Sequence, residues 1–301
     1  MTKEAVDSQE LPHLYPDGIF IYWHPDRNLH PGLKAILNQH LPDHYLIITD
    51  LITEERHFPA DIGGQVGNVF YGNYEAKGFI QQLLEQKSLV WNKLANNLPA
   101  FADQESSNLT IDGGFNVPIP GTNIIIIGNP DISSQGIETY TNSGNKPILL
   151  PRLTHANVET DWPSPLYGSH LDTLLTGFLD LNHPDQPIHL YIDEVLLELA
   201  KKTSLTLPLA PALEKYFQQE MDLIRLARPL DNNLVKNGAC NLKFVKTRNG
   251  WLAFVPSIKT LGPDLANDLN SCGYTIVPLG AEQWQQGGGP KCRSLEIKWL
   301  A

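Results

Sequence analysis

Cysteine, positive charge and long apolar runs are all scarce in this 301-residue sequence. Its three cysteines, Cys240, Cys272 and Cys292, are too few and too widely spaced for a disulfide framework or a zinc cluster. The most apolar stretch, Ile124–Ile127, is far too short to cross a bilayer, and the polar N-terminus has no apolar core of signal-peptide length. We therefore expect reduced thiols, a cytoplasmic location and no membrane partner.

The charge balance narrows the choice of partners. Lys and Arg number 22 against 33 Asp and Glu, and this net charge of −11 argues against a protein that follows nucleic-acid phosphates. It is compatible with a cationic ligand. Apolar residues make up 42% of the chain, which excludes wholesale disorder. No linker divides the chain, so we expect a single domain over residues 1–301 with a flexible tail at residues 1–15.

Short apolar segments alternate between strand-like and helix-like patterns, which indicates an α/β fold. The predicted strands are 19–23, 45–49, 109–111, 123–127, 147–150, 188–192, 242–246, 251–256, 275–279 and 294–299. The predicted helices are 30–40, 78–95, 136–143, 194–202, 214–226 and 262–272. Arg248-Asn249-Gly250 is typical of a hairpin turn between two of the strands.

Four glycine-flanked segments carry reactive side chains beside small residues, where a ligand can approach closely. They are residues 60–64 with Asp61, 111–116 with Asp112, 168–173 with His170 and Asp172, and 287–294 with Cys292. Asp61, Asp112 and His170 are 51 and 58 residues apart (112 − 61 and 170 − 112), and Cys292 follows after 122 (292 − 170), about twice that interval. This spacing favours a repeated unit of about 50–60 residues with reactive groups on equivalent loops.

Each segment also has a structural interpretation. Asp-Gly-Gly is common in turns whose aspartate bonds its own backbone, and His-x-Asp on a strand suits a surface ion pair. A glycine run before a cysteine is compatible with a loop ending in a buried thiol. Cys240 and Cys272 stand in apolar segments without polar company and are interpreted as core thiols. The histidines between residues 24 and 57 lack ligand spacing, so we predict no metal site.

A thiol, an imidazole and three carboxylates are the groups that attack on a guanidinium carbon requires. Carboxylates hold the planar, cationic N–H fork in bidentate fashion. A thiolate is the strongest nucleophile available near neutral pH. Histidine then protonates the leaving nitrogen and activates the water that follows.

The sequence resembles the guanidine-modifying enzyme superfamily, and within it the arginine and agmatine deiminases. Residues 170–173, His-Leu-Asp-Thr, are similar to a segment of arginine deiminases, and residues 288–292, Gly-Gly-Pro-Lys-Cys, to their Gly-Gly-Pro-Arg-Cys nucleophile loop. Asp112-Gly113-Gly114 stands where the family has Glu-Gly-Gly, and Asp61 where it has Arg-Asp. The resemblance implies an α/β propeller of five ββαβ units around a pseudo-fivefold axis, with the site in its central channel.

The resemblance also implies roles for individual residues. Cys292 would be the nucleophile, His170 the general acid and base, and Asp112 the group that orients His170. Asp61 and Asp172 would clamp the guanidinium. Gly289 of the nucleophile loop would line the substrate, and no cofactor or metal would be needed. The expected partner is a small guanidine or an arginine side chain.

Two departures from the family bear on the substrate. Members that act on free arginine hold its α-carboxylate with arginines, but this chain has Asp131 and Gly287 at the matching positions. Because Asp131 would repel a carboxylate, we expect free arginine to be a poor substrate beside agmatine, another guanidino amine or peptidyl arginine. Asp112 is one methylene shorter than the usual Glu, and Ala60 replaces an Arg, so either change could weaken turnover.

Other functions remain open at this point. Amidino transfer to an amine uses the same thiouronium intermediate as hydrolysis. Release of two ammonias, as in an arginine dihydrolase, and hydrolysis of a methylated arginine are further alternatives. A non-catalytic protein that recognises arginine side chains is a fourth, although such a binder has no use for Cys292. The oligomeric state is not indicated.

Overall fold

A computed structural model describes most of the chain as two compact units. The described residues are 17–51, 59–87, 98–103, 114, 116–128, 132–150, 171–202 (backbone only for 199–202), 222–280 and 288–299. Unit 1 comprises Met1–Ser107 and Cys292–Ala301, and unit 2 comprises Asn108–Lys291. The boundary therefore falls within the Gly-Gly-Pro-Lys-Cys motif, between Lys291 and Cys292.

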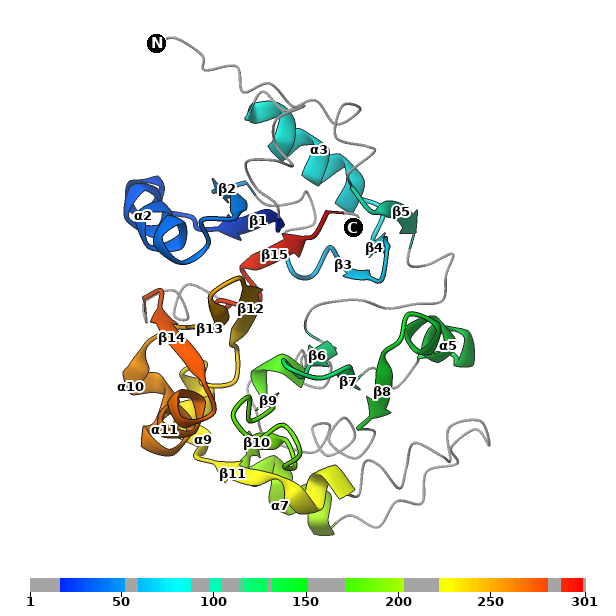
Figure 1. Cartoon of the computed structure of the whole chain (residues 1–301), viewed down its shortest axis with the longest axis vertical. Helices are drawn as coiled ribbons and strands as arrows, with labels where there is room; N and C mark the ends of the chain where they lie inside the picture. The colour runs from blue at the N-terminus through cyan, green and yellow to red at the C-terminus, as the bar shows by residue number, and fades with distance from the viewer. Residues whose placement is uncertain are drawn as a thin grey trace. The chain divides into compact units, whose positions relative to one another are not determined.

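Unit 1 contains two three-stranded sheets (Figure 1). In the first, β1 (Gly18–Trp23) pairs antiparallel with β15 (Ser294–Ile297) and parallel with β2 (His44–Thr49). The turn η1 (Arg27–Leu29) and α2 (His30–His40) connect β1 to β2. In the second, β4 (Val69–Gly72) pairs antiparallel with β3 (Gly63–Val66) and parallel with β5 (Ala100–Asp103). The helix α3 (Ala76–Gln86) lies between β4 and β5 in the sequence.

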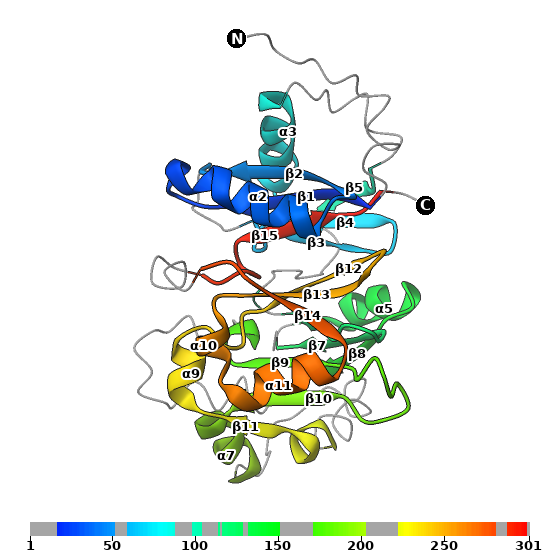
Figure 2. The same ribbon diagram turned by 60° about the vertical axis from the view of Figure 1, so that its left-hand side comes forward.

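Unit 2 contains three sheets of the same plan (Figure 2). The first has β6 (Asn116–Pro118), β7 (Ile124–Ile127) and β8 (Lys146–Leu149), with α5 (Ser134–Asn142) before β8. The second has β9 (Leu175–Phe178), β10 (His189–Asp193) and β11 (Arg228–Leu230), with the turn η2 (Leu171–Thr173) before β9 and α7 (Glu194–Lys202) after β10. The third has β12 (Lys243–Thr247), β13 (Gly250–Val255) and β14 (Tyr274–Pro278). In the sequence, α9 (Asn232–Lys236) precedes β12, and α10 (Ile258–Leu261) and α11 (Pro263–Ser271) connect β13 to β14.

Every sheet thus repeats one ββαβ unit, with an antiparallel pair followed by a parallel crossover. The middle strands β4, β7, β10 and β13 begin at residues 69, 124, 189 and 250, so the intervals are 55, 65 and 61 residues. The sheet of β1 departs in its connection, because its antiparallel partner β15 comes from the far end of the sequence. The α/β class predicted from the sequence is confirmed. A repeated unit is present as well, but two of its intervals are longer than the predicted 50–60 residues.

Short strands that contain glycine or proline escaped the sequence analysis. β3 and β4 hold three glycines between them, and β6 and β11 are three-residue strands that each contain a proline. Such segments have low β-propensity and no measurable alternation, so their pairing partners determine their structure. The predicted strand 109–111 and most of the predicted helix 214–226 lie outside the described residues.

Apolar side chains form separate cores within the two units. In unit 1, Phe70 of β4 and Phe79 and Leu83 of α3 pack with Ile19 and Ile21 of β1. Unit 2 has one cluster beneath β7, β9 and β10 and another between β13, β14 and α11. Within the described segments, no helix combines the length and the apolar character needed to cross a bilayer.

Candidate functional site

Cys292 lies in unit 1 directly before β15, next to the segment that carries Asp61. The backbone N–H of Ala60 donates to the carbonyl oxygen of Cys292 at 3.2 Å. Cys292 is only 6% exposed, and Asp61 is partly buried. Gly63, two residues after Asp61, has a φ of +154°, and a Cβ there would stand 2.3 Å from the Tyr71 carbonyl oxygen. Only glycine therefore fits this close approach, and two of the predicted glycine-flanked segments meet here.

Arg293 places a buried cation immediately after Cys292. Its side chain is fully buried, and its guanidinium carbon lies 4.7 Å from the centre of the Trp23 ring, a cation–π contact. Burial lowers the pKa of the Arg293 guanidinium, while Tyr22 and the Cys292 thiol act in the opposite direction. The guanidinium therefore places a positive charge close enough to Cys292 for the two groups to interact electrostatically.

Asp172 is the corresponding buried group in unit 2. It stands in η2, its side chain is 1% exposed, and its Oδ2 accepts a hydrogen bond from Asn241 Nδ2 at 3.0 Å. Lys291 Nζ lies 3.4 Å from the same oxygen. A buried carboxylate needs such compensation, because an uncompensated charge away from water is costly.

Asn241 also fixes the backbone of the nucleophile loop. Its Oδ1 accepts from the backbone N–H of Lys291 at 3.1 Å. A Cβ on Gly289 would stand 2.7 Å from that oxygen, so any side chain there would displace Asn241. Lys291 Nζ in turn donates to the Asn116 carbonyl oxygen at 2.6 Å. Asn241 therefore connects the loop to Asp172, with both of its amide atoms engaged.

The Asp-Gly-Gly segment meets the His-Leu-Asp-Thr segment in unit 2. The backbone N–H of Asp172 donates to the Gly114 carbonyl oxygen at 3.2 Å. Unit 2 thus brings together parts of the three predicted segments that it contains, and unit 1 brings together the segments that carry Asp61 and Cys292. His170, Asp112 and Asp131 lie outside the described residues, so their roles stay predictions.

Asn241 and Lys291 are the site residues that the sequence analysis missed. Lys291 could have been found, because it stands inside the nucleophile motif where the family has arginine. Asn241 gives no such signal. It follows α9 in a stretch without a recognisable motif. Only its contacts with Lys291, 50 positions away (291 − 241), and with Asp172, 69 positions away (241 − 172), distinguish it.

The other two cysteines differ from each other. Cys240 lies in the apolar core of unit 2, and burial raises the pKa of its thiol well above the ordinary value. Cys272 is equally buried, but its Sγ lies 3.5 Å from His189 Nε2. The expectation that Cys272 has no polar company is therefore wrong, because the histidine comes from a strand 83 residues earlier.

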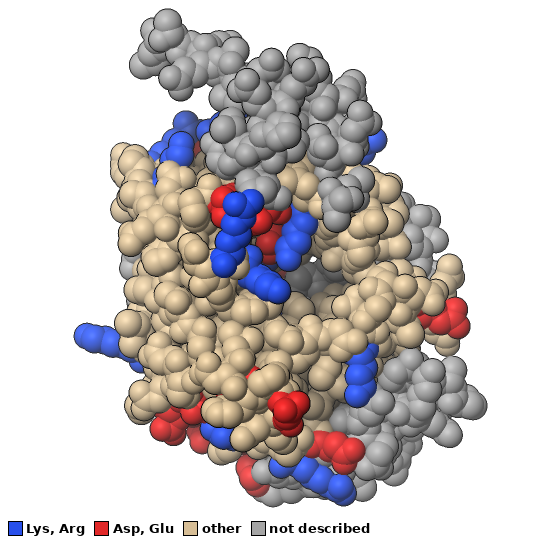
Figure 3. Space-filling view, in the orientation of Figure 1, with Lys and Arg blue, Asp and Glu red and all other residues tan. Residues whose placement is uncertain are grey.

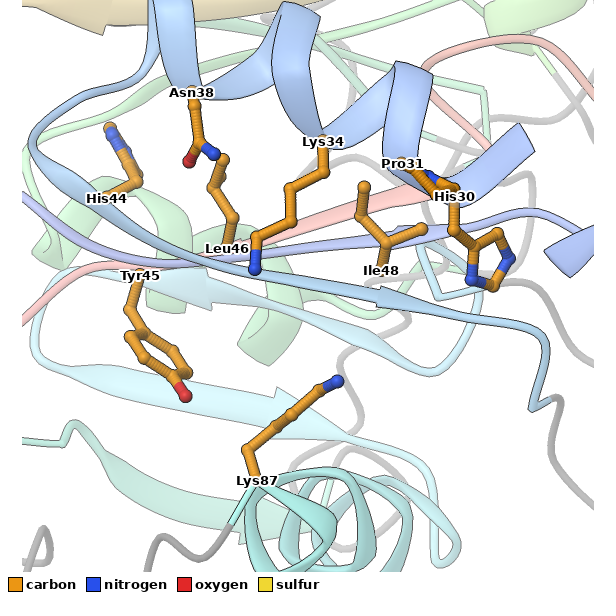
Figure 4. Close-up of a pocket in the computed structure, with 9 residues that line it drawn as sticks. All are labelled: His30, Pro31, Lys34, Asn38, His44, Tyr45, Leu46, Ile48 and Lys87. Carbon is orange, nitrogen blue, oxygen red and sulfur yellow. The ribbon is translucent and has the colours of Figure 1, made fainter. Parts of the chain in front are cut away.

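A separate pocket of 360 Å³ lies in unit 1 on α2 and β2 (Figure 4). Lys34 from α2 and Lys87, just beyond α3, are among its lining residues, together with His30 and His44. None of the predicted site residues lines it. On the face seen in Figure 3, basic and acidic side chains form small groups separated by uncharged surface.

The sequence matches no family model, and a search of curated proteins finds no match. Solved structures do match. The N-terminal domain of ArgZ, an arginine dihydrolase from cyanobacteria, aligns with a TM-score of 0.53 at 13% identity, over 93% of this chain and 98% of that domain. DDAH from Pseudomonas aeruginosa aligns with a TM-score of 0.53 at 13% identity, over 93% and 99%. AgrE in complex with L-arginine aligns with a TM-score of 0.51 at 14% identity, over 93% of this chain and 40% of the AgrE chain.

These neighbours belong to the guanidine-modifying superfamily that the sequence motifs resemble. The chain shares the α/β fold of these structures, with several small mixed sheets. At 13–14% identity the likeness is one of fold.

Proposed function

We propose that this protein is a cysteine-dependent hydrolase that converts a guanidinium group into a ureido group and ammonia. It would act on a carbon–nitrogen bond other than a peptide bond. The expected substrate carries no carboxylate at its far end: agmatine, another guanidino amine or an arginine within a peptide.

The proposed mechanism has two halves that share one covalent intermediate. The Cys292 thiolate attacks the guanidinium carbon and forms a C–S bond, and His170 gives a proton to the departing nitrogen as the C–N bond breaks. Ammonia leaves, and a thiouronium remains on Cys292. His170 then takes a proton from water, the resulting hydroxide attacks the same carbon, and the C–S bond breaks to release the ureido product and the thiolate.

The carboxylates supply the affinity in this proposal. Asp61 and Asp172 would accept N–H bonds from the guanidinium, and Asp112 would hold the imidazole of His170 in the productive tautomer. Lys291 would balance the charge of Asp172 between substrates, so that the buried carboxylate is never isolated. Asp131 would lie toward the far end of the substrate and favour a cationic or neutral group there.

The ion pair between Lys291 and Asp172 carries the proposal. It joins the two most specific motifs, His-Leu-Asp-Thr and Gly-Gly-Pro-x-Cys, across 119 residues of sequence (291 − 172). Cys292 is the next residue in the sequence. A structural neighbour gives independent support, since the N-terminal domain of ArgZ has been solved covalently bound to a reaction intermediate.

We also propose that the five ββαβ sheets close into one five-bladed propeller domain around the site. The shared plan of the sheets and the likeness to enzymes of the same superfamily support this arrangement. A single cooperative unfolding transition, followed by two spectroscopic probes, is the expected result for one domain. Two separate transitions would contradict it.

Ammonia release from a panel of guanidines tests the function. The panel contains agmatine, longer guanidino amines, free arginine and a blocked arginine peptide, and a mass gain of about one dalton identifies the ureido product. Cys292→Ala should lower the rate at least about 10³-fold, whereas Cys240→Ala, the matched core cysteine, should retain it. Release by Cys292→Ala at the wild-type rate would contradict the proposal, and free arginine as the best substrate would contradict the role of Asp131.

Dihydrolysis is a second candidate, favoured by the structural likeness to ArgZ and AgrE. The two reactions differ in stoichiometry. Deimination releases one ammonia per guanidine and leaves a ureido group, whereas dihydrolysis releases two and leaves an amine. Counting ammonia against product separates them, and adding an amine acceptor during turnover reveals amidino transfer.

A further inference from the structure

Three side chains with different metal-binding atoms converge in unit 2, between the second and third of its sheets. Asp180 follows β9, His189 begins β10, and Cys272 lies directly after α11. One ligand atom from each of them lies within 4.8 Å of the other two. The backbone holds this corner together, because Leu181 N–H donates to the Cys272 carbonyl oxygen at 3.0 Å.

His189 is oriented as a metal ligand would be. Its Nδ1 lies 2.9 Å from Asp268 Oδ2, and its ring stacks on Phe178 at 5.3 Å between centroids. Asp268 also accepts from Tyr191 Oη at 2.6 Å. With Asp268 on the Nδ1 side of its ring, His189 presents Nε2 to Cys272, as in the carboxylate–histidine–zinc arrangement.

The distance between the two buried donor atoms matches the geometry of zinc. Cys272 Sγ and His189 Nε2 are 3.5 Å apart. With Zn–S at about 2.3 Å and Zn–N at about 2.05 Å, ligands at a tetrahedral angle stand about 3.6 Å apart. The Asp180 carboxylate lies within 4.8 Å of both atoms. Its oxygens are engaged by the backbone N–H groups of Asn182 and His183 and by the His183 ring, so metal binding would rearrange these hydrogen bonds.

The charges around Asp180, His189 and Cys272 also suit a cation. Asp180 and Asp268 both act on Cys272 electrostatically, whereas the positive charge nearby is that of Arg228, which donates to Asp268. A divalent ion would offset the thiolate of Cys272 and the carboxylate of Asp180. Thiolate, imidazole and carboxylate together select Zn²⁺ over Mg²⁺ or Ca²⁺, which prefer oxygen ligands alone.

We propose that Asp180, His189 and Cys272 form a Zn²⁺ site, with Asp268 as the group that positions His189. On binding, the Cys272 thiol loses its proton to solvent and a Zn–S bond forms. The ion would tie the loop between β9 and β10 to the end of α11. This site is independent of the proposed reaction at Cys292.

Cobalt titration of the metal-free full chain tests the proposal directly. Co²⁺ bound to a thiolate gives a charge-transfer absorption in the near ultraviolet, so the wild type should show this band at one equivalent and lose it when Zn²⁺ is added. Zinc should also raise the melting temperature, since it binds the folded state. Absence of the thiolate band in the wild type would overturn the proposal without any variant.

Substitutions then assign the ligands. Cys272→Ser should weaken zinc binding at least about 100-fold, and Asp268→Asn about 10–100-fold, because the second replaces only the group behind the ligand. The matched controls Cys240→Ser and Cys292→Ser should retain the cobalt–thiolate band. A band that persists in Cys272→Ser and disappears in Cys292→Ser would place the metal at the candidate active site and refute the proposal.

Discussion

Cys292 and Cys272 are both buried thiols with polar neighbours, but different charged groups act on them: Arg293 on Cys292, and Asp180, Asp268 and Arg228 on Cys272. Cys292 precedes the buried Arg293, whose guanidinium interacts electrostatically with it. Cys272 faces the carboxylates Asp180 and Asp268, and these add to burial in raising the pKa of its thiol. A neighbouring cation favours the thiolate, and a neighbouring carboxylate opposes it.

Burial alone therefore does not determine what these thiols can do. Cys292 has a buried guanidinium as its chain neighbour, and a cation there would support the thiolate that nucleophilic attack requires. The surroundings of Cys272 favour a protonated thiol, which would lose its proton to solvent when a metal ion binds. Cys240 provides the apolar reference, because it packs in the core of unit 2 and the pKa of its thiol is raised chiefly by burial.

The largest expected difference is in alkylation. At pH 7.5 in metal-free protein, we expect iodoacetamide to modify Cys292 at least about 100-fold faster than Cys272 or Cys240, because only a thiolate reacts. Peptide mass spectrometry of a quenched time course measures the three rates separately. Equal rates at Cys292 and Cys272 would remove the contrast.

Replacing Arg293, the cation next to Cys292, should slow the alkylation of Cys292. Arg293→Met keeps most of the packing on Trp23 but removes the charge, and we expect about tenfold slower alkylation of Cys292 at neutral pH. Arg293→Lys should recover part of the rate, and the rate at Cys272 should not change. If Arg293→Met reacts as fast as the wild type, the guanidinium does not activate the thiol.

The cation on the other side of Cys292 should matter for stability. Lys291→Met leaves the buried Asp172 carboxylate without its ion pair, and we expect a loss of about 1–3 kcal/mol in the free energy of unfolding. Urea denaturation measures it, with Lys298→Met as a control, because Lys298 is well exposed and its pair with Glu296 spans 3.8 Å. A loss no larger than in the control would show that Lys291 does not compensate Asp172.

The smallest effect concerns alkaline stability. The pKa values of Cys240 and Cys272 are raised in the folded state, so their thiols stay protonated where those of the unfolded chain, with a pKa of about 8.5, have ionised. The unfolded state then binds fewer protons, and stability falls as the pH rises above about 8.5.

Removing either thiol should make the free energy of unfolding decrease less steeply with rising pH. Cys240→Ala and Cys272→Ala should each reduce the slope by at most about 1.4 kcal/mol per pH unit. Chemical denaturation between pH 8 and pH 10 provides the measurement. An unchanged slope in both variants would mean that the native state ionises these thiols as readily as the unfolded chain.

Local pattern was sufficient to predict the longer elements. α7 runs over the predicted residues 194–202, and α2 over the predicted residues 30–40, because apolar residues recur at helical spacing. The hairpin of β12 and β13 was marked by its Asn-Gly turn. Among the short strands, β7, β8 and β15 were predicted from their apolar runs, whereas β3, β4, β5, β6, β9 and β11 were missed, since their pairing depends on partners elsewhere in the chain.

The candidate site shows the same limit. Motif residues such as Asp172 and Cys292 could be selected from the sequence, because their residue types and glycine neighbours are unusual. The contacts of Asn241 and the approach of His189 to Cys272 are tertiary. Neither leaves a local trace, because each depends on segments separated by about 50 residues or more.

The pairing of β15 with β1 has a consequence for synthesis on the ribosome. β1 emerges early and waits for a partner that is translated more than 270 residues later (294 − 23). Cys292 emerges with that partner. Until β15 emerges, a nascent chain thus carries an unpaired strand edge, a state open to chaperones and to aggregation. It acquires the proposed nucleophile only together with that strand, when the first sheet can be completed.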